Sequence, residues 1–156
     1  MGATAKELVT AFMQALQTKQ FEKAATYLSD DFHFMGWTPR PLNKDQFIRL
    51  LSELTEGMPN LAYNFHDLQD VDALLAEGDR ERAVIQITGT QVNEFVLTPL
   101  GLPPILETGR SISLPAQHWE YVVRNNAITT IDVEPVPGGD ISGLLHQLGT
   151  DVQIIQ

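Results

Sequence analysis

The apolar residues of this 156-residue chain change their spacing near residue 60, and this change constrains the fold more than any other feature. Before it, apolar side chains recur every three or four positions, which is the period of an amphipathic helix. After it, they tend to alternate with polar residues, which is the period of a strand with one buried face. Helices followed by a run of strands predict an α+β fold, with the helices on one face of a curved antiparallel sheet.

The first third of the chain supplies the predicted helices. We expect them over residues 4–17, 18–28 and 43–58, with a strand over residues 31–37 between the second and the third. Asn43 precedes the third helix, and Gln46 follows it at the spacing of a capping box, in which each residue satisfies the backbone N–H of the other. These signals are local, so the helix starts should be predictable without knowledge of the tertiary structure.

The remainder of the chain supplies the predicted strands and one last helix. We expect strands over residues 61–68, 70–76, 82–92, 112–123 and 127–133, a turn over residues 77–80, and a final helix from Asp140 to Leu148. Along the long strand, Ala83, Ile85, Ile87 and Gly89 share one face. A three-residue turn over residues 124–126 is expected to join the last two strands.

Composition narrows the partners and the chemistry. The chain carries 20 Asp and Glu against 10 Lys and Arg, so nucleic acid and anionic membranes would be repelled. It has no cysteine, which excludes thiol nucleophiles and cysteine zinc sites, and its histidines lack metal-ligand spacing. We therefore expect no metal and no cofactor. No apolar run reaches the ~18 residues of a membrane span, and the first 20 residues lack the apolar block of a signal peptide, so a cytoplasmic protein is expected.

Several short motifs resemble the SnoaL-like polyketide cyclase family of the nuclear transport factor 2-like superfamily. They are Met58-Pro59-Asn60-Leu61, Ala76-Glu77-Gly78-Asp79-Arg80, Gly89-Thr90, Thr108-Gly109-Arg110 and the tail over residues 140–149. The sequence departs from the family pattern at Gln91 and Glu107, where the family has His and Pro. The resemblance implies one domain over residues 1–156, a cone-shaped sheet closed by N-terminal helices (a cystatin-like roll), an apolar small-molecule ligand and a homodimer.

The same resemblance implies a general acid/base at Asp132, with His118 beside it on the preceding strand. In the expected three-residue turn, facing residues have numbers that sum to 250, so His118 would face Asp132. Such a pair could move a proton on carbon next to a carbonyl group. The alternative is an exposed polar pair on the convex face of the sheet. Asp140 is a second catalytic candidate, and its alternative is a helix N-cap.

Two further features bear on a binding pocket. The side chains expected to line it are Phe34, Trp37, Gln86, Thr88 and Glu120. The Pro-rich connection over residues 94–109 is unusually apolar for a loop. It could be a lid over an apolar ligand, a dimer contact, or a loop packed on its own core.

These features leave more than one function open. The first is a SnoaL-like small-molecule enzyme or binder, acting without a cofactor as a cyclase or isomerase on a carbonyl-bearing, polyketide-like compound. The second is a non-catalytic ligand-binding or dimerisation module with the same fold. A third is a protein-interaction domain that uses the apolar 94–109 loop.

Overall fold

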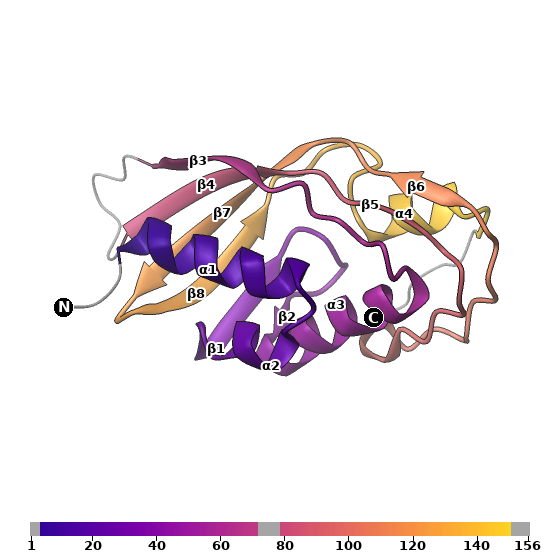
Figure 1. Cartoon of the computed structure of the whole chain (residues 1–156), viewed down its shortest axis with the longest axis horizontal. Helices are drawn as coiled ribbons and strands as arrows, with labels where there is room; N and C mark the ends of the chain where they lie inside the picture. The colour runs from indigo at the N-terminus through magenta and orange to yellow at the C-terminus, as the bar shows by residue number, and fades with distance from the viewer. Residues whose placement is uncertain (1–3, 72–78, 151–156) are drawn as a thin grey trace.

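Helices cover one face of a curved six-stranded sheet in the computed structural model, which describes residues 4–71 and 79–150 (Figure 1). The helices are α1 (Ala5–Gln17), α2 (Phe21–Ala25), α3 (Lys44–Gly57) and α4 (Ile141–Gln147), with a 3-10 turn η1 (Thr98–Leu100). The strands are β1 (Leu28–Met35), β2 (Leu42–Asn43), β3 (His66–Asp70), β4 (Asp79–Ile85), β5 (Thr88–Thr90), β6 (Ser111–Ser113), β7 (Gln117–Arg124) and β8 (Ala127–Val133). The expected α+β class is confirmed.

The main sheet has the order β2-β1-β8-β7-β4-β3, and β5 pairs with β6 in a separate ribbon. Its neighbouring strands are antiparallel except for β1 and β8, which run parallel. The expectation of antiparallel pairing therefore does not hold at this pair. Parallel neighbours need a long connection, and here most of the chain lies between the two strands. Nothing local to either strand could have indicated the pairing.

Both long helices begin at capping boxes. At α3, Asn43 Oδ1 accepts from the Gln46 N–H and Gln46 Oε1 accepts from the Asn43 N–H, both at 2.9 Å, as the sequence predicts. At α1, Thr4 and Glu7 make the same reciprocal pair at 3.1 Å. Satisfying two otherwise unpaired N–H groups fixes where each helix starts.

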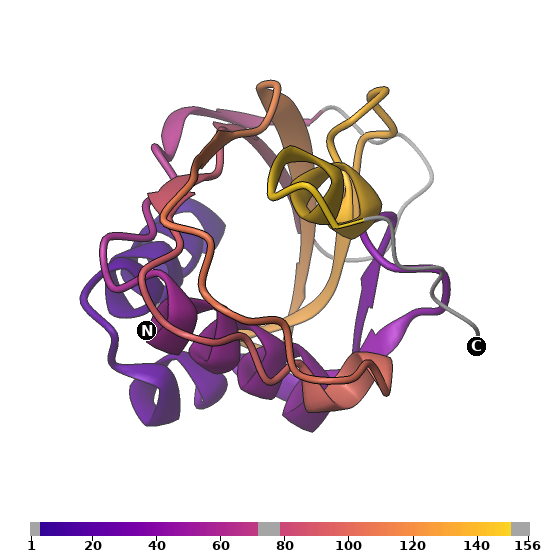
Figure 2. The same cartoon turned by 90° about the vertical axis from the view of Figure 1, so that its right-hand side faces the viewer.

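The two longest predicted strands each break into two. The 82–92 strand becomes β4 and β5, and the 112–123 strand becomes β6 and β7. The predicted alternation survives the break, because Ala83, Ile85, Ile87 and Gly89 are all buried. At the breaks the chain passes from the main sheet to the β5–β6 ribbon, which surrounds the far end of the cone together with α4 (Figure 2). Residues 72–76 of the predicted 70–76 strand and residues 77 and 78 of the predicted turn lie outside the described residues, whereas Asp79 and Arg80, expected in the turn, begin β4.

The β7–β8 hairpin differs from the predicted register. Its turn is the two residues Asn125 and Asn126, both in the left-handed region with φ of 52° and 61°. The facing pairs are Arg124 with Ala127, Val123 with Ile128, Val122 with Thr130 and Glu120 with Asp132. Thr129 is thus an extra residue in β8, and its hydroxyl donates to the Val122 carbonyl at 3.2 Å. The predicted three-residue turn is wrong because the turn has two residues, and the extra residue at Thr129 then shifts the pairing by one more position.

Aromatic side chains fill the space between the inner face of the sheet and the helices. Phe34 of β1 lies 4.4 Å from Phe47 of α3 and 5.4 Å from Trp119 of β7, measured between ring centroids. All three side chains are buried. Stacked and tilted aromatic pairs at these separations add to the burial energy, so this cluster ties the helices to the sheet.

The C-terminal tail closes one end of the cone. Gln147 of α4 accepts from the Ser113 N–H at 2.8 Å and donates to the Ser113 carbonyl at 2.9 Å, so its side chain pairs with β6 as a neighbouring strand would. A Cβ at Gly143 would collide with the backbone carbonyl of Gly138. The Gly and Gln of the tail motif are therefore explained by packing.

Candidate functional site

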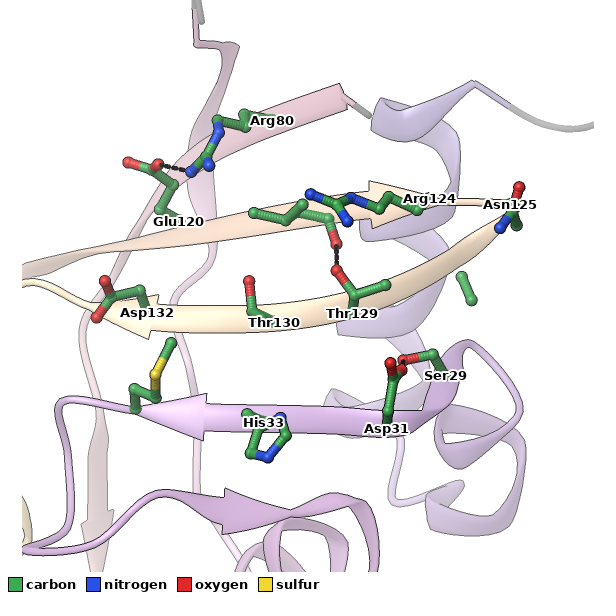
Figure 3. Close-up of a pocket in the computed structure, with 13 residues that line it drawn as sticks. Ser29, Asp31, His33, Arg80, Glu120, Arg124, Asn125, Thr129, Thr130 and Asp132 are labelled. Carbon is green, nitrogen blue, oxygen red and sulfur yellow. Dashed lines mark hydrogen bonds and ion pairs between the residues drawn. The ribbon is translucent and has the colours of Figure 1, made fainter. Parts of the chain in front are cut away.

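An open groove of about 720 Å³ crosses the outer face of the sheet, on the side away from α1 (Figure 3). Its charged and polar lining residues include Asp31, His33, Arg80, Glu120, Thr130 and Asp132. These side chains come from β1, β4, β7 and β8, and they alternate along the strands with the buried residues of the inner face. The groove is therefore lined by the polar outer face of the sheet, whose inner face is mostly apolar.

Glu120 forms ion pairs with two arginines on this outer face. Its two carboxylate oxygens each accept a hydrogen bond at 3.0 Å, one from Arg80 and one from Arg82. Partial burial raises the pKa of Glu120, but the hydrogen bonds from Arg82 and Arg80 outweigh it and hold the pKa below its ordinary value. Glu120 thus remains ionised and engaged at neutral pH.

The structure does not bring His118 opposite Asp132. Asp132 faces Glu120, and His118 Nδ1 instead lies 3.2 Å from Glu134 Oε1. The Glu134 pKa is lowered, chiefly by its hydrogen bond with His118. Asp132 and His118 both lie on the outer face, which is the arrangement that the alternative expected. The predicted pairing is wrong because the two-residue turn and the bulge at Thr129 together move Asp132 two positions along β7, from His118 to Glu120, whereas the catalytic role of Asp132 stays a prediction.

The other predicted site residues are spread over the molecule. Asp140 is the N-cap of α4, where its Oδ1 accepts from the Gly143 N–H at 3.0 Å, as its alternative expected. Phe34 and Trp37 are buried in the core, and the Trp37 indole N–H donates to the Gly139 carbonyl at 2.8 Å. Glu120, in contrast, lies on the outer face.

Gln86 and Thr88, the remaining predicted lining residues, make hydrogen bonds near the β4–β5 break. Gln86 Nε2 donates to the Leu114 carbonyl at 3.2 Å, and Thr88 Oγ1 accepts from Asn64 Nδ2 at 3.2 Å. Both side chains are partly exposed and lie on the opposite side of the chain from Ile85 and Ile87. The five predicted lining residues therefore do not meet in one pocket.

Four buried side chains place a polar atom in the interior between the sheet and the helices. Tyr63 Oη, Glu81 Oε1, Trp119 Nε1 and Tyr121 Oη have no hydrogen-bond partner within residues 4–71 and 79–150. Thr55, beside the Tyr63 hydroxyl, donates its own hydroxyl to a backbone carbonyl of α3. Each buried polar group left without a partner costs about 1–3 kcal/mol. We call these four side chains the interior polar set.

Three members of the interior polar set adjoin one another on the inner face. Glu81 of β4 faces Tyr121 of β7, and facing residues in antiparallel strands have Cβ atoms about 4.5–5.5 Å apart. The ring centroids of Tyr121 and Trp119 are 6.4 Å apart. On the other side of Glu81, Asp70 faces it from the edge strand β3.

Glu81 is a carboxyl group in an apolar interior. Its exposed fraction is 2%, and its pKa is raised to about 7. Burial is the largest cause, followed by a hydrogen bond with Asp70 and repulsion from Asp70 and Asp79, while Lys6 opposes the shift. A carboxyl group that titrates near neutral pH can both accept and return a proton under physiological conditions.

The sequence contained a signal for Glu81 that our prediction did not use. The predicted strand began at residue 82, and its buried face was Ala83, Ile85, Ile87 and Gly89. Extending the same alternation two residues back places Glu81 on that apolar face, and a carboxylate there is the unusual observation. The Tyr and Trp members of the interior polar set carried no comparable signal, because aromatic residues are common in any core.

The 94–109 connection packs mainly on its own core. Phe95, Leu97, Leu100 and Ile105 are buried, whereas Val96 and Leu106 are 43% and 70% exposed. The buried Gln91 side chain organises this loop. Its amide nitrogen donates to the carbonyls of residues 105 and 106, and its oxygen accepts from the backbone and hydroxyl of Thr108. At the position where the family pattern has His, Gln91 is therefore a structural clamp.

Within the described ranges, no cluster of three His, Cys, Asp or Glu side chains is placed to hold a metal ion. In the same ranges, no helix has the length and apolarity needed to cross a membrane.

The chain belongs to the SnoaL-like domain family, whose family model matches residues 9–131. No curated protein matches the sequence. Solved structures that resemble it include a proposed polyketide cyclase from Pseudomonas putida KT2440, with 18% identity, a TM-score of 0.66, and 94% of this chain and 98% of that chain covered. TsrD from Streptomyces laurentii has 18% identity, a TM-score of 0.64, and coverage of 94% and 95%. A SnoaL-like polyketide cyclase from Agrobacterium tumefaciens has 17% identity, a TM-score of 0.62, and coverage of 94% and 99%. These likenesses show the nuclear transport factor 2-like fold.

Proposed function

We propose that this protein binds an apolar, carbonyl-bearing small molecule in the interior of its cone and transfers a proton on it, with Glu81 as the acid/base. The observation that carries the proposal is the interior polar set, of which Glu81, Tyr121 and Trp119 adjoin one another in an otherwise apolar, aromatic interior. Proteins rarely leave buried polar groups unsatisfied, and each such group calls for an explanation such as a catalytic role. A bound ligand would supply hydrogen-bond partners to these polar groups and so offset the free-energy cost of burying them.

The chemistry follows from the types of side chain present. Ionised Glu81 would accept a proton from carbon next to the carbonyl, and the C–H electron pair would move into an enolate. The Tyr121 hydroxyl or the Trp119 N–H would donate a hydrogen bond to the enolate oxygen, where the charge develops. Returning the proton to another carbon isomerises the ketone, and attack of the enolate carbon on a second carbonyl closes a ring.

Entry to the interior requires part of the cone to move, because each atom of the interior polar set is shielded from solvent. Helix α1 contacts β3, β4 and β8 and so covers the row that contains Glu81 and Tyr121 (Figure 1). We propose that a displacement of α1 admits the ligand. Displacing an amphipathic helix from a surface is a motion that proteins make on the microsecond to millisecond scale.

Binding can be tested with the two tryptophans as reporters. In ¹⁵N-labelled protein they give two indole resonances, and Trp37→Phe assigns them. We expect acetophenone, 2-tetralone or anthrone to shift the Trp119 indole signal, while the Trp37 signal, held by the Gly139 carbonyl, stays in place. Tetralin, which lacks the carbonyl of 2-tetralone, should bind at least tenfold more weakly. If none of the three ketones shifts the Trp119 signal, binding in the interior is refuted.

Catalysis can be tested separately by following the exchange of 2-tetralone α-hydrogens in D₂O by NMR. We expect the wild type to accelerate exchange above the rate in buffer, and Glu81→Gln to abolish the acceleration while retaining the Trp119 shift. Binding without acceleration would instead favour the non-catalytic ligand-binding module.

A homodimer is also part of the proposal. Val92, Val96 and Leu106 lie on or next to the 94–109 loop and are 52%, 43% and 70% exposed, which supports an interface there. Light scattering on the purified protein should give twice the chain mass, and Leu106→Asp should reduce it to one chain. A monomeric wild type would refute this part.

A further inference from the structure

A base that works in a closed interior needs a way to exchange its proton with solvent. Glu81 has 2% of its surface exposed and lies beneath α1, so bulk water does not reach it directly. Asp70 faces Glu81 from the edge strand β3 and is exposed. Facing residues of antiparallel strands have Cβ atoms about 4.5–5.5 Å apart, so the two carboxyl groups lie within reach of a hydrogen bond, and this proximity is one cause of the raised pKa of Glu81. Within this pair, Asp70 is thus in contact with solvent, whereas Glu81 is shielded from it.

We infer that Asp70 and Glu81 hold one proton between them across the β3–β4 pair, and that Asp70 is the positioning residue through which Glu81 exchanges this proton with solvent. The inference rests on the proposed function for its catalytic meaning. The transfer is balanced, because Glu81 gives its proton to the Asp70 carboxylate, Asp70 releases it to water, and no electrons change hands. The pair lies at the solvent end of a row that continues inward to Tyr121.

Electrostatic repulsion between the two carboxylates favours a shared proton over two ionised groups. Two carboxylates in hydrogen-bond contact cannot both ionise cheaply, so one of them retains a proton to a higher pH. The buried partner retains it, because desolvation penalises its charged form. The other charged groups that act on Glu81 are Lys6 from α1, which favours its ionised form, and Asp79 from β4, which opposes it. Tyr121 faces Glu81 from β7 and is itself kept neutral by burial, which raises its pKa.

The first test measures the pair in the protein without ligand. The Glu81 carboxyl carbon is followed by ¹³C NMR in glutamate-labelled protein and assigned with Glu81→Gln. In the wild type we expect a midpoint near 7. Asp70→Asn removes the neighbouring charge and offers an amide donor to the carboxylate, so it should lower the midpoint by at least one pH unit. Asp79→Asn is the matched control and should lower it less. An unchanged midpoint in Asp70→Asn overturns the inference.

The second test asks whether Asp70 serves catalysis. Exchange of 2-tetralone α-hydrogens should rise with pH through the wild-type Glu81 midpoint. Asp70→Asn should move this profile to lower pH and reduce its plateau at least threefold, whereas Asp79→Asn should leave the plateau within a factor of two. A plateau unchanged in Asp70→Asn overturns the exchange role. If the NMR midpoint shifts as expected but no ketone binds, the proton-sharing pair stands and the proposed function fails.

Discussion

Gln91 and Thr108 are joined by two hydrogen bonds to one oxygen. Gln91 Oε1 accepts from the Thr108 hydroxyl at 2.9 Å and from the Thr108 backbone N–H at 3.2 Å. The other half of the amide donates to two carbonyls of the same loop, so a single side chain pairs with four groups of the backbone and of Thr108. These hydrogen bonds join two residues that are 17 apart in the sequence, and they hold the segment between them as a packed loop.

Replacing Gln91 should therefore destabilise the 94–109 loop. Gln91→Ala leaves several buried groups without partners, and we expect the free energy of unfolding in urea to fall by about 2–4 kcal/mol. Gln91→His should lose less, since neutral imidazole keeps one donor and one acceptor. The control is Asn93→Ala, which removes an exposed hydrogen bond to Glu56 and should cost under about 1 kcal/mol. Equal losses in Gln91→Ala and Asn93→Ala would contradict the clamp.

The two-residue turn of the β7–β8 hairpin makes a prediction that the three-residue turn does not. Asn125 and Asn126 both have positive φ, and a β-branched residue is strained there. We expect Asn125→Val to lower the free energy of unfolding by about 1–2 kcal/mol. Asn126→Gly should be neutral or stabilising, because Asn-Gly is a preferred pair for this turn. Thermal melts followed by circular dichroism measure both. A neutral Asn125→Val would favour the three-residue turn instead.

Glu81 predicts an unusual dependence of stability on pH. Its pKa is raised in the folded protein from an ordinary 4.5 to about 7. Below pH 4.5 both the folded and the unfolded chain carry the proton, and the stabilisation is complete. Between pH 4.5 and 7 the unfolded chain releases the proton first, so stability falls as pH rises, by up to about 3 kcal/mol in total. Above pH 7 the loss is complete.

Glu81→Gln should remove this dependence. At pH 8 we expect the variant to be more stable than the wild type by up to about 3 kcal/mol, and at pH 4.5 to be nearly equal to it. Urea unfolding at both pH values measures the difference. Glu120→Gln is a useful contrast, because the lowered pKa of Glu120 stabilises the fold above its ordinary pKa, an effect lost as pH falls. Equal effects of Glu81→Gln at both pH values would show that the pKa of Glu81 is not raised in the folded state.

The Asp132→Asn variant tests whether the catalytic base lies on the outer or the inner face of the sheet. Its side chain is exposed on the outer face, so Asp132→Asn should leave the melting temperature within about 2 °C of the wild type. If Glu81 is the base, the same variant should also leave the exchange of 2-tetralone α-hydrogens unchanged. Loss of exchange in Asp132→Asn, with exchange intact in Glu81→Gln, would restore Asp132 as the catalytic residue and refute the interior site.

Local features of the fold were predictable from the sequence. The Asn43–Gln46 capping box fixed the start of α3, and the helix N-cap offered as the alternative for Asp140 is the role it has at α4. The buried face of Ala83, Ile85 and Ile87 followed from alternation alone. Each of these depends on groups a few residues apart, whose geometry is set by the chain itself.

The tertiary structure decided the site. The two-residue turn and the extra residue at Thr129 together decide which side chains face each other across β7 and β8, and they place His118 beside Glu134 rather than opposite Asp132. The parallel pairing of β1 with β8 and the burial of Glu81 beneath α1 likewise depend on segments far apart in the sequence. Because strand side chains alternate with a period of two, a shift by one residue re-pairs every position beyond it. The sequence by itself determined the elements and their caps, whereas register and packing determined which carboxylate lies in the dry interior.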